Sequence, residues 1–521
     1  MTKALWYASL LIGTAAVLGL GLSSVDQASR SAPRDRVGAD TTQQVQASAD
    51  SGSVYVEDGE RVRLLIGHVR GRQDSTFLFS DRAYEYPERE EFLFLGNVLI
   101  VERGDSLRAD TVLYNEATKT GRARGRVRLS DGEVDVRAPS GLYFSQEKRA
   151  RFEEGVTLID SLAEITSRKG TYWSDEKRAE LEETVRLQAE RTYMEADTLT
   201  YFRETEVSIA RGQVFIERIG GEDEAAADSA MRTLLFGQWA YNDEQAGFSR
   251  MKGRPLLVQL RRDSTGTEVD TLVIRAVLLE ALDQDSLQRL VAVDSVRIWQ
   301  RDFAAVADSV VYERVGPAAD TLLAGTLAAV RREETRLFRQ PMAWVEAAQV
   351  SGDTIRVKGR GGDIDSLFVR NNTFVAQHDS ATGRIQQLRG RHLVGVFGDD
   401  STRTFTVGPN AEVIYFRKDK DDRLLGGQVS GDLGIFVARN EELERVLFPG
   451  EYQGAYYPEN VIPEPFQLDG FRWEPERKPR KALLLREDRI LQRLEQYARR
   501  EAPLQEADST RMERPAQQQR R

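Results

Sequence analysis

Carboxylates that return at one place in a repeated pattern are the first candidates for chemistry in this sequence. Asp81, Asp110, Asp197 and Asp308 recur at equivalent bends. Two carboxylates could act as the acid and base of a glycosidase. A catalytic pair would occur once, however, whereas an Asp that recurs in every repeat is typical of a residue that caps its own turn. We therefore interpret these residues as structural, and a carbohydrate-active enzyme on a β-helix is the third-ranked alternative.

Other catalytic and metal-binding patterns are missing from the sequence. It contains no cysteine, and its three histidines, His68, His378 and His392, share no ligand spacing. This excludes a Cys nucleophile, thiolate metal sites and the lipid-modified Cys of a lipoprotein. GxSxG, HExxH, Walker and helix-opening GxGxxG motifs are also absent. We expect no enzymatic activity, no metal and no cofactor.

A line of tyrosines is the next candidate for function. Tyr114, Tyr143, Tyr172 and Tyr201 are spaced 29 residues apart. Stacked phenol rings usually pack at a core or its rim with the hydroxyl reaching water. They could also line a path for a sugar or an acyl chain. Packing is the favoured interpretation, and the second one stays open.

Apolar residues with the same spacing must position these side chains. Three lines share the 29-residue step: Val69, Val98, Val127, Val156, Val185 and Val214; Ile100, Leu129, Leu158, Leu187 and Ile216; Leu65, Phe94, Ala123, Phe152, Leu181 and Ala210. A fixed period of this length indicates stacked copies of one supersecondary unit that bury a continuous core. The lines could be a filled core, or an open trough in which an acyl chain lies; periodicity does not separate the two.

Alternation within each repeat predicts β-strands. In residues 122–129 every second residue is arginine, and the residues between them are Ala, Gly, Val and Leu. No repeat has room for a crossover helix, so we expect antiparallel strands. Glycines at positions 67, 96, 125 and 212 predict bulges or corners.

The chain divides into six segments by composition. We expect a signal peptide or signal anchor over 1–25, whose residues 4–22 are almost wholly apolar, and a flexible tether over 26–53. Regular repeats follow over 54–219, an acidic loop over 220–232, and a less regular continuation over 233–474. A charged helix and tail over 475–521 complete the chain. The net charge of -10, mixed along the sequence, argues against a nucleic-acid partner.

The repeat resembles a known family. Phe94-x-Gly96-Asn97-Val98-x-Ile100, followed by Leu107-Arg108-Ala109-Asp110-Thr111-x-x-Tyr114, resembles the organic-solvent-tolerance, or lipopolysaccharide-transport periplasmic bridge, family. Residues 342–355, 385–397 and 405–415 resemble its long members in Bacteroidetes-like bacteria. The likeness covers about residues 60–460. This chain is longer than the minimal bridge, and it has no room for the outer-membrane barrel of the translocon member.

The resemblance implies an all-β fold, an open, twisted antiparallel β-jellyroll of solenoid type. It also implies a periplasmic scaffold that carries lipopolysaccharide from the inner to the outer membrane, with the acyl chains in an internal groove. Other lipopolysaccharide-transport proteins would dock by edge-to-edge strand pairing, and residues 4–22 could anchor the chain in the inner membrane. The expected groove lining is Phe94, Val98, Ile100, Val127, Leu129, Phe152, Val156, Leu158, Val185, Leu187, Val214 and Ile216. The alternative is a structural or adhesive β-solenoid of the cell envelope without lipid cargo.

Overall fold

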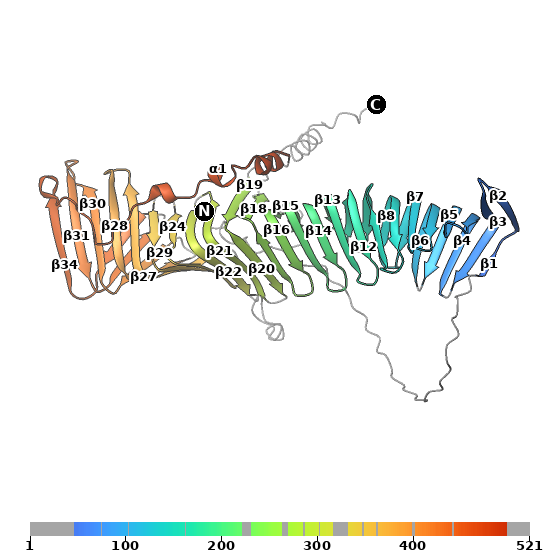
Figure 1. The fold of residues 1–521 in the computed structure, drawn as a ribbon. Helices are drawn as coiled ribbons and strands as arrows, with labels where there is room; N and C mark the ends of the chain where they lie inside the picture. The colour runs from blue at the N-terminus through green and yellow to red at the C-terminus, as the bar shows by residue number, and fades with distance from the viewer. Residues whose placement is uncertain are drawn as a thin grey trace, which may run out of the picture. The chain divides into compact units, whose positions relative to one another are not determined.

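The computed structural model describes residues 46–73, 75–102, 104–161, 163–220, 231–262, 269–284, 287–301, 303–315, 332–345, 348–360, 363–398, 402–439 and 442–496. Within them, the contacts define an N-terminal unit (46–219 and 237–251) and a C-terminal unit (220, 231–236 and 252–496). Both consist of antiparallel strands (Figure 1). This confirms the expected all-β antiparallel fold.

The N-terminal unit contains β1 (Gln46–Ser48), β2 (Ser51–Glu57), β3 (Glu60–Gln73), β4 (Thr76–Tyr86), β5 (Glu91–Glu102), β6 (Asp105–Asn115), β7 (Thr120–Ser130), β8 (Asp135–Phe144), β9 (Arg149–Phe152), β10 (Val156–Ile159), β11 (Ala163–Ser167), β12 (Lys169–Trp173), β13 (Arg178–Ala189), β14 (Thr192–Phe202) and β15 (Val207–Gly220). The boundary between the units passes through β16 (Met231–Asp243) and β17 (Phe248–Lys252).

The C-terminal unit contains β18 (Leu256–Arg262), β19 (Val269–Arg275), β20 (Leu278–Gln284), β21 (Leu287–Gln300), β22 (Phe303–Val315), β23 (Arg332–Phe338), β24 (Met342–Val345), β25 (Ala348–Ser351), β26 (Thr354–Arg360), β27 (Asp363–Asp379), β28 (Arg384–Phe397), β29 (Thr402–Gly408), β30 (Ala411–Lys418), β31 (Leu424–Gly431), β32 (Gly434–Arg439), β33 (Glu442–Leu447) and β34 (Tyr452–Pro458).

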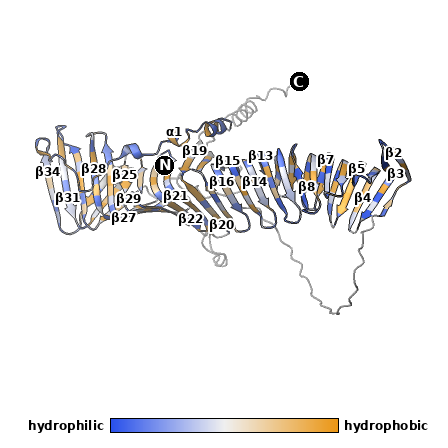
Figure 2. Ribbon diagram, viewed as in Figure 1, coloured by the Kyte–Doolittle hydropathy of each residue, from blue (hydrophilic) through white to orange (hydrophobic). Residues whose placement is uncertain are grey.

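Long strands bend at a bulge, so each contributes to two wings. In β5 the pairing with β6 shifts between Leu95 and Val98. We call the strand halves that lie on the same side of the bulges as residues 98–102 of β5 wing A. The halves on the side of residues 91–95 are wing B. A Cβ on Gly170 of wing B would meet the Val156 side chain of wing A, so the wings face each other. Hydropathy alternates along the strands, as a sheet with one face turned inward requires (Figure 2).

The corner between the wings depends on a glycine and an aspartate. Gly96 has φ +75°, and a Cβ there would overlap the Asp81 carboxylate of the preceding strand. That carboxylate accepts a hydrogen bond from Asn97 Nδ2 at 3.0 Å. The interpretation that each Asp caps its own turn was therefore wrong: the side chain reaches the bulge of the next strand, because the bulge brings that backbone within reach.

The same corner occurs in the C-terminal unit. Asp308 accepts a hydrogen bond from Arg339 at 3.0 Å, and Asp353 accepts one from Asn372 at 2.9 Å. The recurrence of Ala307-Asp308-x-x-x-Tyr312 in the sequence thus corresponds to the same bend.

The last strand of the C-terminal unit ends at Pro458, and residues 459–490 then follow the sheet as a mainly extended stretch. We call this stretch the C-terminal segment. It contains η3 (Glu459–Val461), η4 (Pro475–Arg477) and α1 (Lys481–Leu484), and a further helix covers 488–496. Residues 1–45, with the expected signal or anchor, and the tail from 497 lie outside the described residues. In the described part of the chain, no helix combines the length and apolarity needed to cross a bilayer.

Candidate lipid-binding inner face

The inner face of wing A in the N-terminal unit carries an unbroken apolar line. Neighbouring strands pair its members directly, in the order Ile100, Leu107, Leu129, Val136, Leu158, Ile165, Leu187, Met194 and Ile216. Paired residues in adjacent strands share a face. Five of the twelve residues expected to line a groove belong to this line: Ile100, Leu129, Leu158, Leu187 and Ile216.

The other expected residues also lie on the inner face, at varied depth. Val98, Val127, Val156, Val185 and Val214 lie beside the corner and are at most 4% exposed. Phe152 of wing B is buried as well, whereas Phe94, Ile100, Leu187 and Ile216 are partly exposed. In the middle of the unit the inner face is therefore packed, and it is more accessible towards the outer repeats.

The tyrosine line lies on the inner face of wing B. Each ring has a small residue directly opposite it on the next strand: Gly121 for Tyr114, Ala150 for Tyr143, Ala179 for Tyr172 and Ser208 for Tyr201. Large and small side chains alternate and fill the space between the wings. Packing, the favoured interpretation, agrees with Tyr172 being only 5% exposed.

The tyrosine hydroxyls connect wing B to the tip of wing A. Tyr172 donates a hydrogen bond to Asp131 Oδ2 at 2.8 Å, and Tyr201 donates one to Asp160 Oδ2 at 3.4 Å. Lys148 Nζ lies 2.6 Å from Glu102 Oε2, and Arg203 donates to Asp131 at 3.1 Å. We call these contacts the polar seam. It joins the two wing tips across the side of the unit opposite the corner.

Burial perturbs the titration of the seam. It raises the pKa of Tyr172, which the hydrogen bond to Asp131 raises further. The pKa of Tyr201 is raised by burial and by the charge of Asp160. Burial also raises the pKa of Glu244, with further contributions from Glu206 and Asp160. The hydroxyls thus remain protonated donors at neutral pH, facing carboxylates.

Wing A of the C-terminal unit carries a corresponding inner line. Its members pair in the order Leu257, Ile274, Ile298, Ala305, Ala343, Val350, Val375, Leu388, Val413 and Val429. The first five are buried, whereas the members from Val350 to Val429 are partly exposed. The inner face therefore presents accessible apolar side chains over β25, β27, β28, β30 and β31.

The outer face of this wing is the more deeply buried one. Its line runs through Ala304, Trp344, Gln349, Ala376, Gln387 and Ile414, each at most 3% exposed. The C-terminal segment covers it with Phe466, Leu468, Phe471 and Trp473, which pack on Phe374, Ile414 and Phe416. The chain's own C-terminal segment therefore buries the outer apolar face and leaves the inner one accessible.

Two glutamines fix the C-terminal segment on the sheet. Gln387 donates to the carbonyl of Phe466 at 3.2 Å and accepts from the amide of Leu468 at 2.8 Å. Gln349 donates to the carbonyl of Arg472 and accepts from the amide of Glu474, both at 2.9 Å. Further along, Arg275 forms an ion pair with Glu487 at 2.8 Å. These bonds satisfy backbone groups that would otherwise be buried without partners.

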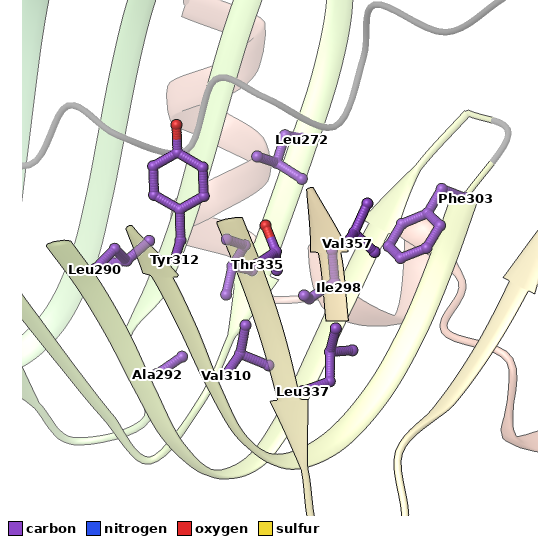
Figure 3. Close-up of a pocket in the computed structure, with 11 residues that line it drawn as sticks. Leu272, Leu290, Ala292, Ile298, Phe303, Val310, Tyr312, Thr335, Leu337 and Val357 are labelled. Carbon is purple, nitrogen blue, oxygen red and sulfur yellow. The ribbon is translucent and has the colours of Figure 1, made fainter. Parts of the chain in front are cut away.

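A small apolar cavity lies between the wings of the C-terminal unit (Figure 3). Leu272, Ile298 and Phe303 line it from wing A; Val310, Leu337 and Val357 line it from wing B. Its volume of 40 Å³ is far below the roughly 300–1,000 Å³ of sites for drug-sized ligands. The space between the wings is filled here, so an acyl chain fits only where the inner line is accessible or the wings separate.

The inner face is most exposed at the outermost strands of each unit. Val54 and Val56 of β2 are 65% and 71% exposed, and Tyr452 and Tyr456 of β34 are 65% and 62% exposed. Among the described strands, β1 and β2 pair only with β3, β33 pairs only with β32, and β34 pairs only with β31. These strands keep one edge free for pairing.

The sequence contained signals that could have revealed the seam. Glu102, Asp131 and Asp160 follow the same 29-residue step, and each precedes a tyrosine of the tyrosine line by 41 residues. The contacts of the C-terminal segment left no such signal, because Gln349 and Gln387 belong to no periodic line.

The comparison with protein families agrees with the resemblance of the repeat. Residues 44–197 match the family described as OstA-like protein. No curated protein matches the chain. Among solved structures, the chain is similar to LptH of Pseudomonas aeruginosa, the LptA-homologous periplasmic component of a lipopolysaccharide transport device. The identity is 15%, the alignment covers 28% of this chain and 85% of LptH, and the TM-score is 0.15. The similarity to the OstA-like protein family is therefore confined to residues 44–197, which lie in the part of the chain that contains the N-terminal unit.

Proposed function

We propose that the chain is a non-enzymatic periplasmic carrier of lipopolysaccharide, with the acyl chains lying along its inner faces. The observation that carries this proposal is the inner line of the C-terminal unit. Val350, Val375, Leu388 and Val413 are partly exposed, whereas Gln349, Ala376, Gln387 and Ile414 on the outer face of the same strands are at most 3% exposed. Apolar side chains that stay accessible in a continuous row are typical of a ligand surface.

The size of the hydrophobic effect favours a continuous line. Shielding one methylene from water stabilises a bound chain by about 0.8 kcal/mol, so an acyl chain of about 12 carbons gains roughly 10 kcal/mol. A gap along the carrier would expose several methylenes and act as a barrier. In each unit, neighbouring strands of wing A contribute one apolar residue each to such a line.

The N-terminal unit must open its wings to accept a chain. The polar seam opposes this, but each of its hydrogen bonds contributes only about 1 kcal/mol net. Burial of one acyl chain outweighs two or three such bonds. Loading would therefore begin at the exposed outer strands and separate the wing tips in turn.

Docking and location follow from the same proposal. The free edges of β1, β2, β33 and β34 would pair with other lipopolysaccharide-transport proteins by β-augmentation. A carrier that bridges the two membranes works in the periplasm, and residues 4–22 would anchor it in the inner membrane. The transport direction is then from the inner to the outer membrane.

One observation favours a second candidate function, a structural or adhesive β-solenoid of the cell envelope. The inner face in the middle of the N-terminal unit is packed, with the Val line at most 4% exposed. A filled interior needs no cargo.

Lipid bound to the purified chain distinguishes the two functions. We expect lipopolysaccharide to copurify with the full chain, and Leu388→Glu to lower its amount several-fold by placing a charge on the inner face. Val396→Glu is the matched control, because Val396 of the same strand is 52% exposed on the outer face. Mass spectrometry that finds no lipopolysaccharide in the wild type, or equal amounts in both variants, would support the solenoid instead.

A further inference from the structure

One outer surface of the N-terminal unit is apolar where its neighbours are polar. On wing A, Phe77 and Phe79 of β4 pair with Val101 and Leu99 of β5. Leu78 and Ile100 occupy the alternate inward positions, so these four side chains lie on the outer face. Phe77 is 40% exposed and Phe79 is 37% exposed. We call the four residues the outer patch.

The repeat itself does not require the outer patch. One repeat later, the four equivalent positions are all polar: Ser106, Arg108, Arg128 and Ser130. The strands β6 and β7 form the same bent ladder with these residues. The apolar side chains on β4 and β5 are therefore specific to this end of the unit.

Arginines border the outer patch on both sides. Arg72 and Arg70 of β3 lie opposite Phe77 and Phe79, and Arg108 of β6 lies opposite Leu99. The Arg72 guanidinium lies over the Phe77 ring, 5.3 Å from its centroid. Apolar side chains flanked by guanidinium groups match the interface of an anionic bilayer, where the former enter the acyl boundary and the latter meet phosphates.

The position of the patch in the chain agrees with a membrane partner. The apolar stretch 4–22 is separated from the first described residue by 23 residues, 23–45. A chain of that length spans at most about 80 Å. We propose that the outer patch docks the N-terminal unit on a phospholipid membrane surface that carries anionic headgroups. This inference does not depend on lipid transport, because the patch lies on the outer face.

Single-cysteine labelling tests the proposal directly, because the native chain has no cysteine. The full chain, reconstituted through its own N-terminus, carries a polarity-sensitive fluorophore at Phe79→Cys or at Arg137→Cys. Arg137 occupies the position of Phe79 two repeats later and is exposed. Vesicles contain phosphatidylcholine alone or phosphatidylcholine with phosphatidylglycerol, and carry a nitroxide quencher at the acyl boundary.

We expect a blue shift and nitroxide quenching at residue 79 with phosphatidylglycerol, their loss in neutral vesicles or high salt, and neither at residue 137. A third variant, Leu99→Arg with Val101→Ser, copies the next repeat and should abolish the signal at residue 79. Equal signals at residues 79 and 137, or at residue 79 in both vesicle types, would overturn the proposal. A blue shift that grows with protein concentration without vesicles would overturn it too, because it would assign the patch to a second copy of the chain.

Discussion

At the scale of single residues, a few residue types recur with the 29-residue period, and the fold brings them into contact. The corner glycine, the aspartate of the preceding strand and the residue after the glycine form one contact, as Gly96, Asp81 and Asn97 do. Tyr172 and Asp131, 41 residues apart, form another. The first contact sets the bend of the sheet, and the second holds the two wings together.

The corner predicts a graded response to alanine. Gly96→Ala should lower the free energy of unfolding by about 2–3 kcal/mol, because the positive φ is strained and the new Cβ displaces Asp81. Gly104→Ala is the control: its φ is +107°, but no atom lies within 4 Å of the added Cβ. We expect a loss of only about 1 kcal/mol there. Urea denaturation that gives equal losses would contradict the role of the corner contact.

The seam predicts a modest stabilisation by its hydroxyls. Tyr172→Phe should lower the free energy of unfolding by about 1–2 kcal/mol, because Asp131 loses a buried donor but keeps Arg203. Tyr114→Phe is the control, since no described residue accepts a hydrogen bond from that hydroxyl. Urea denaturation of both variants measures the difference. An unchanged free energy of unfolding in Tyr172→Phe would show that the seam hydrogen bond does not stabilise the unit.

Glu244, whose pKa is influenced by Asp160 of the polar seam, predicts a pH dependence. The pKa of Glu244 is raised in the folded chain, chiefly by burial. The folded state therefore holds this proton more tightly than the unfolded state, and the associated stability is lost as the pH rises through the raised pKa. Glu244→Gln should stabilise the chain at pH 7 and leave it unchanged well below the normal carboxyl range. Thermal unfolding of the wild type and the variant across pH checks this. A variant that is less stable than the wild type at pH 7 would contradict the prediction.

At the scale of elements, the period was enough to assign faces but not depth. Val127 and Leu158 lie on the inner face as their spacing indicates, and Gly125 lies at a bulge. The sequence could not indicate that the outer face of wing A in the C-terminal unit is the buried one. That burial comes from residues such as Leu468, which follows the last strand and packs on residues distant in sequence, among them Phe374. The alternation of residue types along a strand identifies its two faces, but it does not indicate which segment covers either face.

The packing of the C-terminal segment predicts a loss of stability when Leu468 is truncated. Leu468→Ala should cost about 2–5 kcal/mol, because Leu468 is 4% exposed within an apolar cluster. Leu483→Ala, in the same segment but 59% exposed, should cost little. Limited proteolysis should cut the segment faster in Leu468→Ala alone. Equal cleavage of the two variants would indicate that the segment is not held by this contact.

At the scale of the whole molecule, both units use one design: antiparallel strands that bend at residues with positive φ, and an apolar inner line on wing A. The OstA-like match covers residues 44–197, and the corner and inner line recur beyond it in the C-terminal unit. Under the proposed function, each unit offers a lipid its own apolar inner line.

The most direct test of that claim is photocrosslinking in cells that make lipopolysaccharide. A photoreactive residue would replace Leu158 or Leu388 on the inner line, with outward Thr157 and Val396 of the same strands as controls. We expect lipopolysaccharide adducts at Leu158 and Leu388 and none at Thr157 and Val396. Adducts at neither inner site, or equally at inner and outer sites, would contradict the account.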